Sequence, residues 1–186
     1  MAETLRKQHE NFTIGLIEDA FMALFEQKGL NLTVREICDL AGISRPVFYR
    51  LYDDKFDVLE GIEKRLIEEL AKINNKMPSA AYRSDMKAFP YVEESAVYVY
   101  ENRKFFGPLI GSPGEVNFIN RWCRLMRNDM MRRLTNEKKM LENTEVYTYS
   151  ISRAAIGVYE YWLKYAPDMS VGEITQIITN LWKTLY

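Results

Sequence analysis

Apolar residues recur every three or four positions along almost the whole chain, which is the spacing of helices with one buried face. The first such stretch runs from about Thr4 to Lys28, and its apolar face holds Ile14, Ile17, Phe21 and Leu24. Glycine and proline stand at the ends of these stretches, and no segment alternates as a β-strand would. The sequence therefore predicts an all-α protein of about nine helices.

The remaining helices follow from the same periodicity. A long helix is expected from about Lys55 to Asn75, with Asp53 or Asp54 as its N-cap. Further helices are expected over residues 90–102, 103–110, 115–134, 146–165 and 170–185, and loops over 77–84, 111–114 and 135–143. Pro90 either begins or kinks its helix, and Pro108 is expected to break the next one.

Residues 32–59, LTVREICDLAGISRPVFYRLYDDKFDVL, have the spacing of a helix-turn-helix. Thr33 and Glu36 form a capping box at the start of the first helix. Gly42 can adopt the left-handed backbone that ends this helix. Ser44 is then expected to cap the second helix, with Pro46 in its first turn, where a missing N–H is harmless.

The second helix of this segment has two different faces. Phe48 and Leu51, three residues apart, are expected to point inward. The outward face presents Arg45, Val47, Tyr49 and Arg50, a set that suits the major groove of DNA. The segment therefore predicts DNA binding, and an ordinary helical hairpin is the alternative.

The segment LTVREICDLAGISRPVFYRLYDDKFDVLE, preceded by a helix ending in ALFEQKGL, resembles the TetR family of bacterial transcriptional regulators. The likeness is closest to members with an SRxxFYRxYxDK-type recognition segment. It implies an all-α dimer with a three-helix helix-turn-helix DNA-binding head, expected at residues 1–54. A helical ligand-binding and dimerisation body is expected at residues 55–186.

Carried over position by position, the resemblance implies DNA contacts by Thr33, Ser44, Arg45, Pro46, Val47, Tyr49, Arg50 and Lys55. Two positions depart from the family pattern. Pro46 stands where glycine or another small residue is common, and Arg50 stands where histidine is common. The base preference of other members is therefore not carried over.

Two C-terminal helices carry a second signal. Small residues at helical spacing, which let another helix approach closely, occur at Ser150, Ala154 and Gly157. Ser170 and Glu173 form a capping box for the last helix, whose wide apolar face includes Ile174, Ile177, Ile178, Leu181, Trp182 and Leu185. Both helices pack either within their own subunit or against a partner. The resemblance implies a four-helix dimer interface with Ser150, Ala154, Gly157, Ile174, Ile178 and Trp182.

Aromatic residues are dense in the middle of the chain. One interpretation is that they fill the core. The other is a pocket for a small-molecule effector, with candidate lining residues Tyr98, Phe106, Phe118, Trp122 and Tyr159. The residues do not decide between these interpretations.

The charge of the chain is unusual for a DNA-binding protein, because such proteins are usually basic. The net charge of the 186 residues is −1, and residues 1–55 hold seven Lys or Arg against nine Asp or Glu. Positive charge must therefore be arranged locally, on the second helix of the helix-turn-helix and at Lys55, with Arg6 and Lys7 as further candidates. The low charge leaves a protein-binding adaptor on the same fold as an alternative.

The sequence gives little support for a catalytic or metal-binding site. His9 is the single histidine, Cys38 and Cys123 are read as reduced packed thiols, and no GxSxG, HExxH, Walker or dinucleotide-binding pattern occurs. We expect no enzyme, cofactor or metal.

No apolar run reaches membrane-spanning length and no signal peptide is evident, so a cytoplasmic protein is expected. The sequence thus predicts a homodimeric, sequence-specific DNA-binding regulator, a repressor released by a small ligand, with an activator as the alternative.

Overall fold

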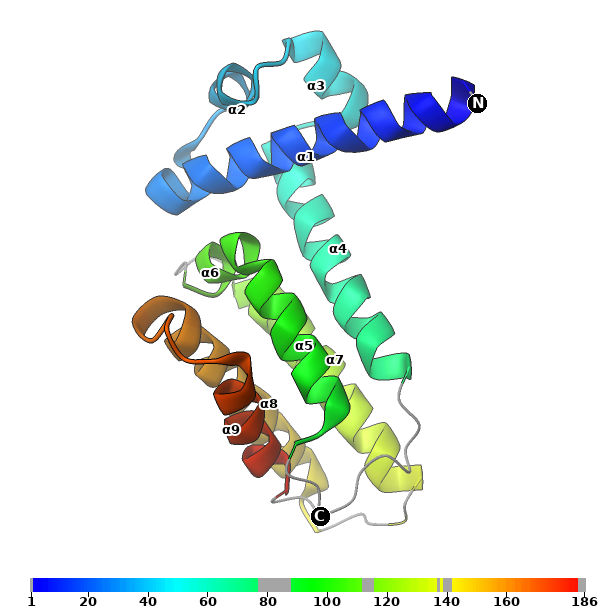
Figure 1. Ribbon diagram of the computed structural model, residues 1–186, viewed down its shortest axis with the longest axis vertical. Coiled ribbons are helices and arrows are strands. Elements are labelled where there is room, and N and C mark those ends of the chain that lie inside the picture. Colours follow the sequence, from blue (N-terminus) through cyan, green and yellow to red (C-terminus); the bar gives the residue numbers. More distant parts are fainter. Residues whose placement is uncertain (1, 77–87, 112–115, 137, 139–141, 184–186) are drawn as a thin grey trace. The chain divides into compact units, whose positions relative to one another are not determined.

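A computed structural model describes residues 2–76, 88–111, 116–136, 138 and 142–183. Within these ranges every regular element is a helix, which confirms the all-α prediction (Figure 1). The chain divides into two compact units, Met1–Arg65 and Leu66–Tyr186, and the division falls within helix α4 (Lys55–Lys76). The functional boundary that we placed at residue 54 stays a prediction.

The N-terminal unit holds α1 (Ala2–Lys28), the 3₁₀ turn η1 (Gly29–Asn31), α2 (Val34–Ala41), α3 (Arg45–Leu51) and the first half of α4. α1 packs against α2, and α2 packs against α3. Buried apolar side chains from all four helices form one core, including Ile17, Phe21, Ile37, Phe48 and Ile62. An ion pair between Arg65 and the buried Glu18, 2.6 Å long, ties α4 to α1.

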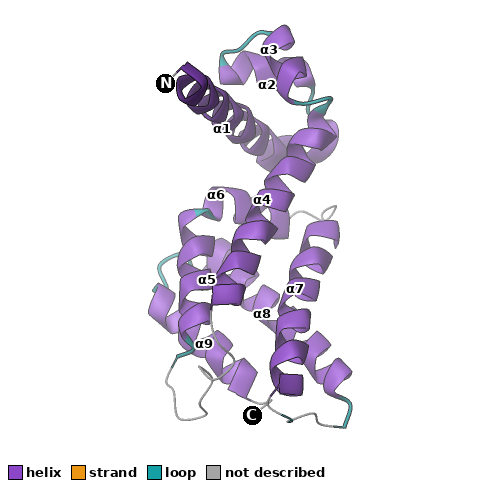
Figure 2. Ribbon diagram, turned by 90° about the vertical axis from the view of Figure 1, so that its right-hand side faces the viewer, coloured by secondary structure: helices purple, strands orange, loops and turns teal. Residues whose placement is uncertain are grey.

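The C-terminal unit holds the rest of α4 with α5 (Pro90–Glu101), α6 (Arg103–Gly111), α7 (Val116–Asn136), α8 (Thr144–Tyr165) and α9 (Val171–Lys183). α7 and α8, α8 and α9, and α5 and α9 pack along one another, while the short α6 packs on α7 and α8 (Figures 1 and 2). Among the described helices, none has the length and apolarity needed to cross a bilayer.

A buried arginine of α7 joins this helix to α4. Arg133, fully buried, donates from Nε to Asp129 Oδ2 at 2.7 Å and from its second terminal nitrogen to the Asn74 carbonyl at 3.1 Å. Asp129 is 5% exposed, so both charges are largely removed from water. The hydrogen bond to Asn74 therefore joins α7 to α4, while the ion pair with Asp129 lies within α7.

The two prolines in question behave differently. Pro90 occupies the first position of α5, with Phe89 as the N-cap residue, so it begins the helix without kinking it. Pro108 lies inside α6, and the expected break there is wrong. Residues on both sides of the proline, among them Phe106 and Leu109, are buried and hold the short helix together. The expected loop at residues 77–84 lies outside the described residues, as do positions 112–115 and Leu185.

The apolar face of α9 turns toward its own unit, which corrects part of the expected dimer interface. Ile174, Ile178 and Trp182 are each at most 2% exposed. The Trp182 ring lies edge-on to Tyr91 of α5, with ring centroids 5.3 Å apart. This part of the apolar stripe is thus covered by α5 and α8 of the same chain, whereas Ile177 is exposed.

Candidate nucleic-acid interface

The start of α2 is fixed by the expected capping box. Glu36 N donates to Thr33 Oγ1 at 3.3 Å, and Thr33 N donates to Glu36 Oε2 at 2.9 Å. Lys28 also donates to Glu36, at 2.5 Å. These hydrogen bonds, the one from Lys28 foremost, lower the pKa of the Glu36 carboxyl from 4.5 to about 2. Thr33 itself is exposed at this end of the helix-turn-helix.

The turn between α2 and α3 is also as predicted. Gly42 is left-handed, with φ 67° and ψ 31°, and Ile43 N closes the turn on the Cys38 carbonyl at 3.1 Å. Ser44 occupies the N-cap position of α3, where its carbonyl accepts from Phe48 N at 3.1 Å. Its hydroxyl makes no capping hydrogen bond, which corrects the expected side-chain cap. That exposed hydroxyl keeps its donor and acceptor capacity for another molecule.

α3 separates a buried face from an exposed one. Phe48 is fully buried, whereas the adjacent Tyr49 is 56% exposed. Arg45, Pro46 and Arg50 are exposed and Val47 is half-buried. Among the residues described, neither Arg45 nor Arg50 forms an ion pair, so both guanidinium groups keep the five N–H donors that suit phosphate and guanine.

Lys55 has a structural role that the sequence pattern did not reveal. Its half-buried ammonium donates to the carbonyls of Leu30 at 2.6 Å and Leu32 at 2.9 Å. These bonds tie the start of α4 to the end of η1. Two of the three ammonium donors are therefore used inside the unit, and one is left for a phosphate.

The expected pocket aromatics lie together in the C-terminal unit. Ring centroids are 5.9 Å apart for Tyr98 and Phe106, 5.0 Å for Phe106 and Trp122, and 5.0 Å for Trp122 and Tyr159. Phe118 is 5.8 Å from Phe106 and, like it, fully buried. The five residues form one continuous aromatic cluster within the core.

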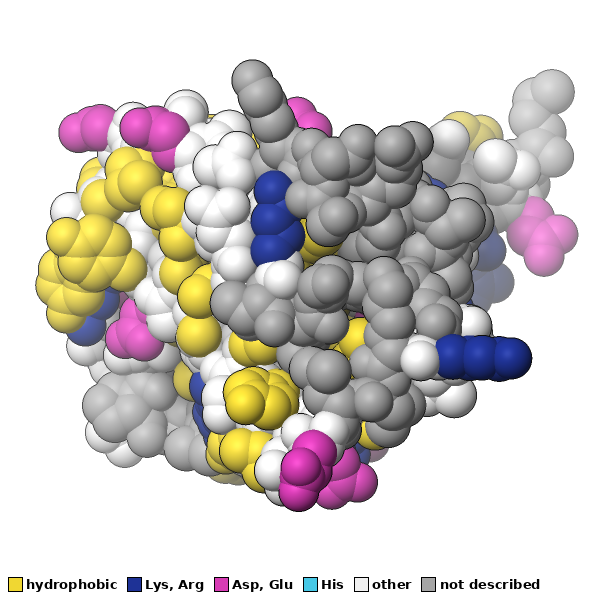
Figure 3. All heavy atoms as spheres, turned by 90° about the horizontal axis from the view of Figure 1, so that it is seen from below, with side chains coloured by type: hydrophobic (Ala, Val, Ile, Leu, Met, Phe, Trp, Pro, Cys, Tyr) yellow, Lys and Arg dark blue, Asp and Glu magenta, His cyan; other side chains and the backbone are white. Residues whose placement is uncertain are grey.

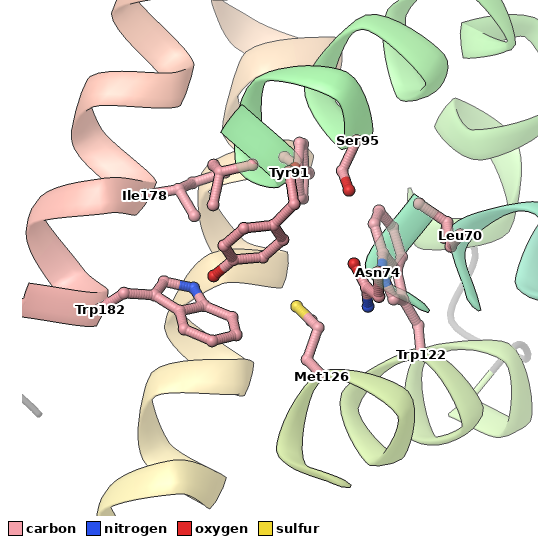
Figure 4. A pocket seen from close by; sticks show the side chains of 10 residues that line it. Leu70, Asn74, Tyr91, Ser95, Trp122, Met126, Ile178 and Trp182 are labelled. Carbon is pink, nitrogen blue, oxygen red and sulfur yellow. The ribbon is translucent and has the colours of Figure 1, made fainter. Parts of the chain in front are cut away.

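A cavity of about 20 Å³ lies beside this cluster, and its walls come from α4, α5, α7, α8 and α9 (Figure 4). Of the five aromatics, Trp122 and Tyr159 line it. Its other walls include Leu70, Asn74, Tyr91, Ser95, Met126 and Trp182. Figure 4 shows the polar ends of Asn74 and Ser95 and the Met126 sulfur directed toward the same space. The volume suffices for one water molecule.

Two donors in the cavity wall are buried. The Trp182 indole N–H is buried and has no hydrogen-bond partner among the described residues. Burial also raises the pKa of the Tyr159 hydroxyl, so this group stays protonated and able to donate. A water or a ligand atom that accepts a hydrogen bond would therefore be favoured there.

Two family comparisons match the two parts of the chain. Residues 17–62 match the family described as bacterial regulatory proteins, tetR family, and residues 87–184 match the one described as transcriptional regulator C-terminal region. The second match alone covers more than half of the chain. This chain belongs to the TetR family of bacterial transcriptional regulators. It is therefore a DNA-binding regulator of transcription, as the helix-turn-helix indicates.

Solved structures of other TetR-family proteins share the fold. A regulator from Syntrophomonas wolfei has a TM-score of 0.71 at 15% identity, covering 94% of this chain and 95% of that one. One from Streptococcus agalactiae has a TM-score of 0.67 at 19% identity, covering 96% and 97%. The repressor FadR of Thermus thermophilus, in complex with lauroyl-CoA, has a TM-score of 0.58 at 16% identity, covering 91% and 92%. No curated protein sequence matches the chain.

The exposed side of α8 and α9 in this TetR-family chain is apolar. Ser150, Ala154 and Gly157 are exposed on α8. A groove of about 320 Å³ between the two helices is lined by Ala154, Gly157, Val158, Tyr161, Ile174 and Ile177. Tyr161 is 59% exposed, and hydrophobic side chains are visible on the left-hand part of the face that Figure 3 shows. Ile174 contributes to the floor of the groove, but Ile178 and Trp182 do not line it.

Sequence reasoning missed several residues of the cavity. Asn74 and Ser95 are polar residues within the apolar faces of α4 and α5, and both are buried. A polar residue that interrupts an apolar helical stripe is a signal that could have been used. Trp182 was placed at the interface because a stripe shows which face is apolar but not what covers it.

Both Cys38 and Cys123 are buried free thiols, and burial raises the pKa of each.

Proposed function

We propose that this protein is a repressor that binds an inverted-repeat operator as a homodimer and is released by a small ligand. The observation that carries the proposal is the exposed face of α3, which presents Arg45, Tyr49 and Arg50 while Phe48 anchors the opposite face in the core. A short helix of this kind enters the major groove with its polar face toward the bases. Its place of action is the cytoplasm, where the bacterial chromosome lies.

Each residue of the head has an assigned role in this proposal. Arg45, Tyr49 and Arg50 contact base edges, and Val47 contacts a thymine methyl group. Thr33, Ser44, Pro46 and Lys55 lie against the sugar–phosphate backbone, Lys55 through its one remaining N–H.

Operator binding by point variants tests the assignment. Arg50→Ala is expected to weaken operator binding by about 1–3 kcal/mol, because one side chain that contacts a base is lost. The control is Lys64→Ala, which removes one exposed charge from the same unit at a position with no assigned contact. Both are measured by fluorescence anisotropy at one salt concentration. Equal affinities of the Arg50 variant and the parent protein would exclude the assignment.

Dimerisation is supported by the apolar groove between α8 and α9. Exposed aromatic and aliphatic side chains on these helices, including Tyr147, Tyr161 and Ile177, are 39–59% exposed in the single chain. A patch of this kind on a small domain favours a partner surface. A second copy fits because two heads on a twofold axis read an inverted repeat far more tightly than one head.

Ligand release is supported by the buried donors of the cavity in the C-terminal unit. The Trp182 N–H and the Tyr159 hydroxyl offer hydrogen bonds to an acceptor on an otherwise flat, apolar ligand. The complex of the Thermus thermophilus repressor with lauroyl-CoA is a precedent on the same fold. Because the cavity holds about 20 Å³, an effector must displace wall side chains such as Met126.

Two further functions share these observations. An activator would bind DNA in the same way, and deletion of the gene distinguishes the two, since target transcription rises without a repressor and falls without an activator. The excess of acidic residues in the N-terminal part favours a protein-binding adaptor instead. An adaptor would bind no DNA fragment even at low salt.

A further inference from the structure

A second, positively charged groove lies between α7 and α8. It has a volume of about 170 Å³, and its lining includes Arg124, Arg127, Arg153, Asn120, Tyr149 and Ser152. None of these residues lines the cavity beside Trp122, so the groove is a separate site. Neither the helix-turn-helix nor the proposed effector cavity explains its composition.

Among the described residues, no carboxylate lies in this groove to balance its positive charge. Three guanidinium groups line it. Neither Arg124 nor Arg127 forms an ion pair with any residue that the structure describes. Asp129, on the same helix, is buried and already accepts from Arg132 at 2.5 Å and Arg133 at 2.7 Å. Three like charges beside one small groove repel one another, and a bound anion would remove that repulsion.

The groove is also held in shape. Arg153 donates to Asn120 Oδ1 at 2.6 Å and lies over the Tyr149 ring, 5.7 Å from its centroid. The fully buried Ser152 donates from Oγ to the Tyr149 carbonyl at 2.8 Å. Arg124 and Arg127, three residues apart on α7, stand on one side of that helix. One arginine is thus fixed by its neighbours, while two others beside it keep their donors available.

We propose that this groove binds a small anion that carries at least two negative charges, on phosphate or carboxylate groups. Guanidinium groups bind both chemistries through paired N–H···O bonds, and they do so best where the partner's charge is doubled. The half-exposed Tyr149 ring adds an apolar surface for the rest of such a molecule. The site goes beyond the proposed function, because it requires neither operator binding nor the cavity.

Titration calorimetry of the full-length protein tests the proposal with two probes, inorganic pyrophosphate and citrate. Sodium chloride keeps the ionic strength equal in every titration, so general screening contributes equally. We expect one saturable site per chain for at least one probe. Arg124→Gln and Arg127→Gln are each expected to weaken it at least tenfold. The matched control is Arg103→Gln on α6, an exposed arginine outside the groove, and it is expected to leave binding unchanged.

The outcomes distinguish the possible ligands of the groove. Tighter binding of pyrophosphate identifies a phosphorylated ligand, and tighter binding of citrate identifies a polycarboxylate. The proposal is overturned if neither probe saturates, or if the Arg103 variant loses as much affinity as the groove variants. It is equally overturned if Arg124→Gln and Arg127→Gln bind both probes normally but change the sedimentation of the protein, since the groove would then contact another protein chain. Operator affinity, measured separately, tests the proposed function and does not enter this result.

Discussion

At the scale of single residues, the Glu36 carboxylate is the clearest source of pH dependence. Lys28 and Thr33 lower the pKa of this carboxyl in the folded protein from 4.5 to about 2. A group whose pKa is lowered on folding stabilises the fold above its unfolded pKa. We therefore expect Glu36 to contribute fully above about pH 4.5 and to lose its contribution as the pH falls toward 2.

The measurement is urea unfolding of the parent protein and Glu36→Gln between pH 2 and pH 7. Both proteins share every other carboxyl group, so the difference between their free energies of unfolding isolates Glu36. That difference should be largest near neutral pH and should shrink as the pH falls from 4.5 toward 2. A difference that is constant over the whole range would contradict the assigned role.

Local chemistry explains why these residues were predictable from sequence. A capping box needs only two side chains three positions apart, and the structure has both boxes, at Thr33 and at Ser170. Gly42 was predictable because its left-handed backbone is strained for other residues. Lys55 was not predictable in the same way. Its partners, the Leu30 and Leu32 carbonyls, lie more than 20 positions away in sequence.

At the scale of helices, the buried pair of Asp129 and Arg133 makes the strongest prediction. Asp129→Ala leaves a fully buried arginine without the carboxylate that it contacts at 2.7 Å. We expect a loss of about 3–5 kcal/mol in the free energy of unfolding, measured with urea, because removing one partner of a buried ion pair is strongly destabilising.

A double variant provides the control. Asp129→Leu combined with Arg133→Met removes both charges and keeps apolar volume, so it is expected to be more stable than Asp129→Ala. The comparison separates the cost of an unpaired charge from a simple loss of packing. If the double variant is the less stable of the two, the buried arginine left by Asp129→Ala costs less than replacing both side chains, and the prediction is wrong.

Helix positions followed from periodicity, but helix partners did not. The apolar stripe of α9 was predicted, yet Ile178 and Trp182 face α5 and α8 of the same chain rather than a partner subunit. The stripe alone cannot show whether it packs against helices of the same chain or against a partner subunit, because either surface would be apolar. Pro108 was expected to break a helix that continues, since packing of Phe106 and Leu109 on either side outweighs the one lost hydrogen bond.

At the scale of the whole molecule, the proposed dimer depends on the exposed side of α8. Apart from its chain neighbours and the backbone of its own helix turn, no heavy atom would lie within 4 Å of a Cβ at Gly157, so a larger side chain fits the single chain. Gly157→Leu is therefore expected to fold normally but to block close approach of a second copy. We expect sedimentation equilibrium to show a monomer, with operator affinity reduced along with dimerisation.

The matched control for assembly is Gly111→Leu on α6, another exposed glycine with open space around its Cβ position. It adds the same side chain to the same unit outside the groove. This variant should remain dimeric with unchanged operator affinity. A dimeric Gly157→Leu variant would show that subunits meet elsewhere.

The proposed release by a ligand requires that ligand binding and operator binding affect each other. A ligand releases DNA only if it prefers the conformation that binds DNA poorly. By linkage, bound operator must then lower the affinity of the protein for that ligand by the same factor. Trp122 and Trp182 line the cavity, so tryptophan fluorescence should report binding directly. A candidate effector is titrated against free protein and against protein saturated with operator. We expect weaker binding in the second titration, by about 5–150-fold for a typical coupling. The same factor should appear when operator is titrated with and without the compound. Identical ligand affinities in the two states would mean that the compound binds without acting as an effector.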